Sequence, residues 1–149
     1  MKKIILSIFS ATMLFGCAKK KETIRTFEIR EFLLSAQNDY ENPYREVDCW
    51  VRLKGPGFDK RIYGFWDGGS TFKVRVAAID AGDWSWESGS NQPDDSGLNG
   101  IKGSFRAIDW TEEEKQENPN RRGFIQSSAD GHSLQYSDGT PFFFIGDTW

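Results

Sequence analysis

Between Asp48 and Glu87 the chain reads DCWVRLKGPGFDKRIYGFWDGGSTFKVRVAAIDAGDWSWE. Apolar and polar residues alternate here, a period of two that is typical of strands with one buried and one solvated face. The residues expected to face inward are Val47, Cys49, Val51, Leu53, Phe72, Val74, Val76 and Ala78. Turn-forming residues (Gly, Pro, Asp and Ser) separate the alternating runs. The stretch therefore predicts three or four consecutive strands of an antiparallel β-sandwich.

Flanking segments complete the predicted sandwich. We expect strands at 24–29, 31–36, 61–66 and 103–109, with 61–66 as a central strand and with Phe105 and Ala107 facing inward. The segment Ser88–Gly100 is rich in Gly, Ser, Asn and Asp, which predicts a long surface loop. About seven strands is the number of an immunoglobulin-like sandwich, so the fold class predicted is all-β.

Composition narrows the classes of partner. A chain of 149 residues is long enough for one compact domain, and 15% aromatic residues with 15 glycines suit an all-β domain with many turns. The net charge is −3, and loss of Lys2 and Lys3 with a leader would make it −5. Phosphate binding needs a basic face, and no basic stripe interleaved with aromatic residues stands out. We therefore expect no nucleic-acid partner.

The N-terminus has the features of an export signal. Two lysines precede an apolar segment, Ile4–Phe15, which is too short to cross a bilayer but suits a secretory signal. The sequence Leu14-Phe15-Gly16-Cys17 resembles a bacterial lipobox, although Phe15 replaces the usual small residue. We predict a signal peptide at 1–16, lipidation of Cys17 and a flexible tether at 17–23. This would place the protein in the bacterial cell envelope, in the periplasm or on the outer-membrane surface, with the membrane as a partner. The alternatives are an ordinary cleaved signal peptide or a core helix.

Few residues suggest metal or acid–base chemistry. Cys49 is predicted to be a small buried hydrophobe, and His132 a solvated turn residue. Asp94 and Asp95 could help hold calcium but lack the spacing of a dedicated loop, so no metal is predicted, and no cofactor. Three further carboxylates are expected to form turns, namely Asp67, Asp80 and Asp83.

Tryptophans offer a second kind of site, because flat aromatic rings stack on sugars. Trp66, Trp84 and Trp86 could bind carbohydrate, but Trp84 and Trp86 share one strand parity, which favours packing in the core or between domains. Trp50 has the opposite parity to Cys49 and is the better candidate for an exposed or interface aromatic residue.

The C-terminal part changes character. Residues 110–122 predict a linker with a short helix that begins after Thr111 and stops before Pro119. Residues 123–136 predict a hairpin, and an Asp138-Gly139 turn leads into Pro141–Trp149. That segment contains an unbroken apolar run, which is typical of a parallel strand buried on both faces. We expect it to belong to a longer protein; alternatively it closes the sandwich.

Six motifs follow one another along the chain, namely Asn42-Pro43-Tyr44 and residues 64–69, 72–76, 82–86, 118–124 and 138–143. In this order they resemble the N-terminal region of bacterial apiosidase-like glycoside hydrolases. The likeness covers about Phe27 to Trp149. It implies an immunoglobulin-like sandwich at 24–109, a linker at 110–122, and at 123–149 a hairpin and the first strand of an incomplete (β/α)8 barrel.

The resemblance also bears on the catalytic residues. A glycosidase needs two carboxyl groups across the scissile bond, which barrel enzymes place at the ends of different strands. Only one such end is implied here, so no catalytic residue is expected in this chain. Asp147 and Trp149 are implied to bind substrate, and carbohydrate is the expected partner through the barrel. The alternative is a stand-alone carbohydrate-binding or structural, adhesive immunoglobulin-like domain.

Overall fold

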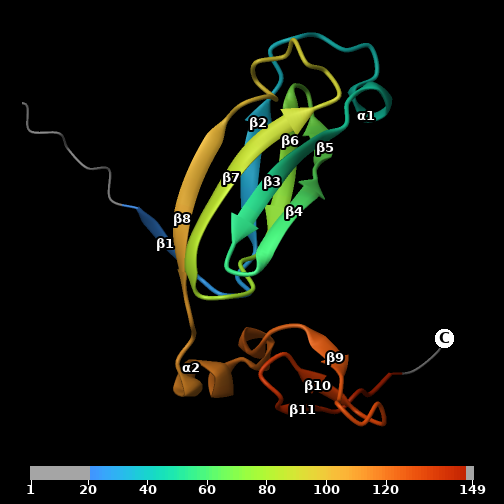
Figure 1. The fold of residues 1–149 in the computed structure, drawn as a ribbon. Coiled ribbons are helices and arrows are strands. Elements are labelled where there is room, and N and C mark those ends of the chain that lie inside the picture. The colour runs from blue at the N-terminus through green and yellow to red at the C-terminus, as the bar shows by residue number, and fades with distance from the viewer. Residues whose placement is uncertain (1–20, 147–149) are drawn as a thin grey trace, which may run out of the picture.

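The computed structural model describes residues 21–146, whose regular structure is mainly strands that form three sheets (Figure 1). The all-β prediction is therefore confirmed. The strands are β1 (Glu22–Arg25), β2 (Arg30–Ser35), β3 (Cys49–Gly55), β4 (Phe58–Tyr63), β5 (Phe65–Gly68), β6 (Thr71–Val76), β7 (Gly82–Ser90), β8 (Lys102–Ile108), β9 (Ile125–Ser127), β10 (Leu134–Tyr136) and β11 (Pro141–Phe142). The helical segments are α1 (Pro43–Glu46), α2 (Glu112–Glu117) and the 3-10 helix η1 (Pro119–Arg122).

Two of the sheets face each other. The larger has the strand order β1-β8-β7-β3-β4, in which β1 pairs with β8 in parallel and the other neighbours are antiparallel. The smaller has the order β2-β6-β5 and is antiparallel throughout. Figure 1 shows the smaller sheet behind the larger one, with the third sheet at one end of the pair.

The core between these sheets consists of the side chains that the alternating pattern predicted. Every residue of that set is at most 8% exposed, as are Phe105 and Ala107 on β8. Trp84 on β7 lies parallel to Phe105, with ring centroids 6.2 Å apart. Trp86 stacks on Phe32 of the opposite sheet at 4.3 Å, so aromatic packing joins the two layers directly.

The prediction of one central strand at 61–66 is wrong. The chain leaves the larger sheet after β4 and enters the smaller sheet with β5, and Gly64 lies between the two strands. A Cβ at Gly64 would come within 2.6 Å of the Lys73 carbonyl oxygen and 2.7 Å of the Cys49 sulfur. The crossing between sheets is therefore possible only because this residue has no side chain. As a result β4 is an edge strand of its sheet.

The prediction of a long surface loop at 88–100 is also only partly right. Strand β7 continues to Ser90, and the connection that follows contains two completely buried side chains, Asp95 and Leu98. Leu98 joins the apolar core, whereas Asp95 collects hydrogen bonds from a neighbouring connection. Composition predicted that this segment is exposed to solvent, but the side chains of Asp95 and Leu98 are buried in the fold.

Residues 110–122 are folded against the sandwich. Helix α2 begins with a capping box, in which the Thr111 hydroxyl accepts from the Glu114 backbone N–H and the Glu114 carboxylate accepts from that of Thr111. The Trp110 indole donates to the Thr26 carbonyl at 2.7 Å, and the guanidinium groups of Arg25 and Arg121 lie over its ring. The predicted short helix is confirmed.

The third sheet has the order β11-β10-β9 and contains the predicted hairpin. Phe27, the non-glycine residue with positive φ (59°) in the described chain, places its ring edge-on against Phe124 at 5.4 Å. This backbone conformation is strained for a bulky residue, so the contact between the sandwich and the C-terminal elements must compensate for it.

The apolar run near the C-terminus lies outside the sandwich core. Within residues 141–146, β11 pairs with β10 and with neither sandwich sheet. Phe143, Phe144 and Ile145 are 84%, 70% and 83% exposed. The alternative that this run closes the sandwich is therefore not observed.

Two leucines on facing sheets test the assignment of the core. Leu53 is fully buried and Leu33 is 66% exposed. We expect Leu53→Ala to lower the free energy of unfolding by about 2–5 kcal/mol, because it leaves a cavity. Leu33→Ala should change it by less than about 0.5 kcal/mol. Chemical denaturation of both variants measures this difference, and equal losses would contradict the strand register.

Candidate functional site

The site residues predicted from the sequence lie outside the described residues. Cys17 precedes residue 21, and Asp147 and Trp149 follow residue 146, so the structure neither places them nor tests their roles. Within residues 21–146 no helix is long and apolar enough to span a membrane. The same residues contain no cluster of three potential metal ligands.

The three carboxylates that the sequence assigned to turns do not come together as a catalytic pair. Asp67 is in β5 and pairs with Lys73 at 2.6 Å. Asp83 is in β7 and pairs with Lys21 at 3.0 Å. Asp80 lies in the connection before β7, where its carbonyl oxygen accepts from the Trp84 indole at 3.0 Å.

Asp95 is the fully buried carboxylate of the described chain, and its partners explain it as a structural group. It accepts from the backbone N–H of Gln37, Asn38 and Gly97 at 3.0, 3.1 and 2.9 Å, and from the Tyr40 hydroxyl at 2.9 Å. Burial by itself raises the pKa of Asp95, but these donors outweigh it and hold the pKa below its usual value. The carboxylate therefore ties together the connections that follow β2 and β7.

Cys49 and His132 have the environments that the sequence predicted. Cys49 is 2% exposed, and burial raises the pKa of its thiol to about 11, so the group is protonated and inert at neutral pH. His132 is exposed in a turn, where its backbone N–H donates to the Asp130 carboxylate at 3.1 Å.

The tryptophans also divide as their parity predicted. Trp84 is 1% exposed, and Trp86 packs between the sheets on Phe32. Trp66 is 38% exposed at the edge of the smaller sheet and donates to the Gly69 carbonyl. Trp50 projects from the outer face of the larger sheet, because it alternates with the buried Cys49 and Val51.

Strand register arranges the outer face of the larger sheet in rows. One row is aromatic, since Trp50 is opposite Tyr63 of β4 and Gly89 of β7. The next row, which we call the charged row, crosses four strands from β4 to β8 and consists of Arg61, Arg52, Glu87 and Lys102. With about 4.8 Å between strands, the charged row is about 14 Å long.

The Trp50 ring is covered on both sides. A Cβ at Gly89 would come within 2.7 Å of the indole nitrogen, so the ring lies on the sheet where that glycine leaves room. The Arg61 guanidinium carbon lies 4.2 Å from the ring centroid, and the Tyr63 ring meets Trp50 edge-on at 6.0 Å. Trp50 is therefore a support for Arg61, while Tyr63 is 60% exposed beside it.

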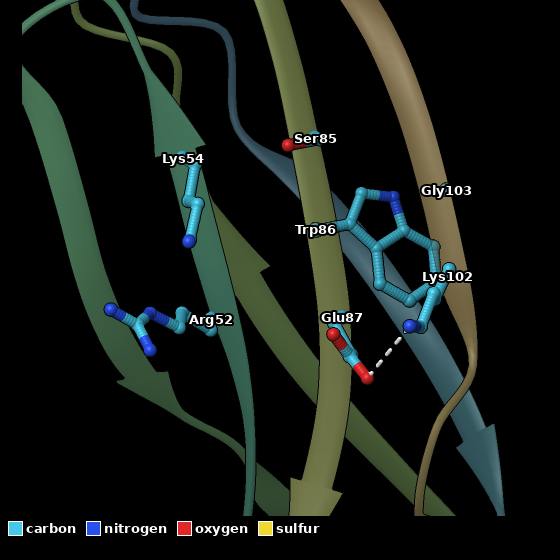
Figure 2. Close-up of a pocket in the computed structure, with 7 residues that line it drawn as sticks. All are labelled: Arg52, Lys54, Ser85, Trp86, Glu87, Lys102 and Gly103. Carbon is cyan, nitrogen blue, oxygen red and sulfur yellow. Dashed lines mark ion pairs between the residues drawn. The ribbon is translucent and has the colours of Figure 1, made fainter.

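A shallow depression of about 320 Å³ adjoins the charged row (Figure 2). Lys54 and Arg52 project beside it from β3, and Lys102 forms an ion pair with Glu87 at 3.2 Å on the other side. Ser85 contributes its hydroxyl to the lining, and Trp86 lies beneath Gly103. The depression is open and flanked by charged side chains that are more than half exposed.

A second hollow of about 260 Å³ lies where the sandwich meets the C-terminal elements, beside Phe27. Several of its charged residues have acidic partners, since Lys115 pairs with Glu112 and Arg121 with Glu117. Arg122 donates to Asp138 at 2.9 Å and to the Thr140 hydroxyl at 3.1 Å. These bonds join η1 to the turn between β10 and β11, which gives Arg122 a structural role.

The charged row is the feature that sequence reasoning missed. No basic stripe interleaved with aromatic residues was visible along the chain, because the row takes one residue from each of four strands. Parity could have given one member, Arg52, since Arg52 and Lys54 alternate with buried residues in the same way as Trp50. The partners from the other strands depend on the register, which the sequence alone does not fix.

Comparisons with known proteins bear on the same region. Residues 23–91 match a family model described as a domain of unknown function (DUF5060). This match runs from β1 to the end of β7 and includes Trp50, Arg52 and Arg61. No curated protein matches the chain.

A crystal structure of a protein from Bacteroides vulgatus, described as "a putative glycoside hydrolase", is similar to 83% of this chain with a TM-score of 0.67. The sequences are 23% identical, so the likeness shows a shared fold. The chain spans 22% of the length of that protein. Together the comparisons show that residues 23–91 are similar to a domain of unknown function and that the chain shares its fold with a part of that longer protein.

Asp95 and Asp94 provide a matched test of the buried carboxylate. We expect Asp95→Asn to lower the free energy of unfolding at pH 7 by about 2–3 kcal/mol, because charge-assisted hydrogen bonds are lost. The pKa of Asp95 is lower in the folded state, so this stabilisation exists above the unfolded pKa of about 3.9 and disappears as the pH falls through the folded value. The exposed Asp94→Asn should have little effect. Denaturation of all three proteins between about pH 2 and pH 7 measures whether the loss of unfolding free energy in Asp95→Asn becomes smaller in acid. A loss that stays constant with pH would contradict the role of the charged carboxylate.

Proposed function

We propose that the chain is the N-terminal accessory region of an exported, lipid-anchored, apiosidase-like glycoside hydrolase that acts on side chains of plant or other polysaccharides. The chain itself is non-catalytic. The motif resemblance supports this proposal, as does the shared fold with a much longer protein described as a glycoside hydrolase. Within residues 21–146, Asp67 and Asp83 pair with lysines and Asp95 accepts hydrogen bonds from the backbone, so these three carboxylates have structural roles.

One observation carries the proposal, namely the exposed apolar surface of the C-terminal elements. Phe143, Phe144 and Ile145 continue from β11, while Phe124 and Ile125 at β9 are 59% and 49% exposed. Such a concentration of large apolar side chains is characteristic of a surface that another structural unit covers. The occupant that we propose is the remainder of a (β/α)8 barrel, with the run 141–149 as its first strand.

The finer division of the chain is part of this proposal. Residues 24–109 are an immunoglobulin-like sandwich, residues 110–122 connect it to the barrel, and residues 123–149 begin that barrel. The two facing sheets and their mainly antiparallel order support the first assignment. The docked Trp110 supports a connection that holds both units in a fixed arrangement.

The remaining roles belong to residues beyond the described range. Asp147 would accept hydroxyl groups of a sugar, and Trp149 would stack on its face, at the mouth of the barrel. Residues 1–16 would direct export, and lipid on Cys17 would hold the protein in the cell envelope, in the periplasm or on the outer-membrane surface. Carbohydrate is then the substrate partner and the membrane the anchoring partner.

A second function is a stand-alone carbohydrate-binding or adhesive immunoglobulin-like domain. The outer face of the larger sheet favours carbohydrate binding, because exposed aromatic and charged side chains lie together on it. The first function requires a catalytic barrel that continues after Trp149, and the second function does not.

Hydrolysis by the extended protein tests the proposal. The gene is expressed once to the codon for Trp149 and once through its downstream reading frame, and both proteins are incubated with plant cell-wall polysaccharides. We expect released sugar from the longer protein alone, because the catalytic carboxylates lie on later strands. Hydrolysis by the shorter chain, or a reading frame that stops at Trp149, would refute it.

Replacement of the apolar run tests its proposed cover. In the chain of 149 residues, Phe143→Ser with Phe144→Ser should leave the melting temperature unchanged and reduce the binding of a hydrophobic dye, because both rings are exposed. In the extended protein the same change should lower the melting temperature by at least about 4 °C, since two buried rings are lost. An unchanged extended protein would show that nothing covers the run. Leu33→Ala serves as the control for loss of an exposed apolar side chain.

A further inference from the structure

The outer face of the larger sheet carries an arginine without an acidic partner. Arg61 is exposed on β4 and makes no ion pair within residues 21–146, and its guanidinium lies over Trp50 at 4.2 Å. Stacking on an indole holds the planar group in one orientation and leaves the N–H donors at its rim free. Arg61 is therefore prepared for an anion before the anion arrives.

The neighbour of Arg61 across the strands makes this arrangement costly without a ligand. Arg52 is directly opposite Arg61 in the register, and like charges at facing positions destabilise a sheet. Asp59 compensates Arg52 with two hydrogen bonds of 2.7 and 2.9 Å, and these bonds lower the pKa of that carboxyl. Asp59 makes no such bond to Arg61, so a bound anion would relieve the remaining repulsion.

The face as a whole is basic although the chain is acidic. On β3, β4, β7 and β8 the outward positions hold more basic than acidic side chains. The basic ones are Arg52, Lys54, Arg61, Lys102 and Arg106, and the acidic ones are Asp59, Asp83 and Glu87. The net charge of the whole chain is −3, so positive charge is concentrated here.

We propose that this face binds an acidic polysaccharide, with a carboxylate or sulfate group of one sugar on Arg61 and neighbouring sugars along the charged row. Arg61 offers paired N–H donors to the oxyanion. The exposed ring of Tyr63 offers an apolar surface to a sugar face, and Ser85 and the carboxylate of Glu87 offer hydrogen bonds to hydroxyl groups. The inference rests on the second function proposed above and names the class of carbohydrate, and the binding does not depend on a catalytic domain.

A polysaccharide suits this face better than a nucleic acid. Asp59 and Glu87 lie among the basic residues, and a nucleic acid with a phosphate at each nucleotide would meet both of them. An acidic polysaccharide carries fewer charges than a nucleic acid and has many hydroxyl groups, which can donate hydrogen bonds to these carboxylates. The open, shallow depression between Arg52 and Lys102 also suits an extended chain more than a compact ligand.

Titration calorimetry at low salt tests the proposal with four probes: polygalacturonate, a sulfated galactan, neutral galactan and single-stranded DNA. We expect the full chain to bind one or both acidic polysaccharides, the two probes distinguishing carboxylate from sulfate, and to bind the neutral polymer and DNA more weakly. Arg61→Gln should weaken binding by about tenfold or more, since a charge-assisted bidentate contact is lost. Binding should also weaken as salt increases.

Arg75→Gln is the matched control, because Arg75 lies on the outer face of the smaller sheet and its guanidinium stacks on Phe65 at 4.8 Å. It removes the same charge and should change affinity by less than about twofold. If Arg61→Gln lowers the melting temperature, Lys102→Gln provides a second test through a side chain that is 68% exposed. Equal losses in the Arg75 variant, no binding of either acidic polymer, or equal binding of neutral galactan or DNA would overturn the proposal.

Discussion

The register of β3 between β4 and β7 is the constraint on which both the core and the outer face depend. It places Val51 and Leu53 inside, opposite Ile62 and Trp86, and places Trp50 and Arg52 outside. A shift by one residue would exchange these two sets and bury charged side chains in the core. The burial of Leu53 therefore fixes, at the same time, that Arg52 stands opposite Arg61 and that Trp50 lies over Gly89.

Although β1 ends at Arg25 and not at residue 29 as expected, local sequence was sufficient for most of the other strands and for which face is buried, because a period of two is encoded in neighbouring residues. It failed at Gly64 and Asp95, where distant contacts decide the structure. Gly64 allows the chain to pass close to Lys73 and Cys49, and nothing nearby in sequence announces that crossing. Asp95 resembles an ordinary loop residue until the backbone of Gln37 and Asn38 reaches it.

The candidate binding face was beyond prediction for the same reason. The charged row takes its members from β4, β3, β7 and β8, so it exists only once those strands are paired. Trp50 was the exception, since its parity alone made it an outward aromatic residue. Its role could not be read from parity, because the structure uses the ring to orient Arg61 and not as an open surface for a sugar.

The two exposed surfaces of the chain require different kinds of partner. Burial of the exposed run Phe143–Ile145 would lower the free energy, so another apolar surface is the partner that suits it. Such a contact would be permanent. The outer face of the larger sheet carries Arg61, exposed ion pairs and hydroxyl groups that remain hydrated, which suits a ligand that binds and leaves. Trp110, just before helix α2, donates to the Thr26 carbonyl, and Phe27 in the strained turn contacts Phe124. These contacts connect the sandwich to the C-terminal elements. The fold can therefore keep the apolar run and the outer face of the larger sheet in a fixed arrangement. A flexible linker at residues 110–122 could not do this.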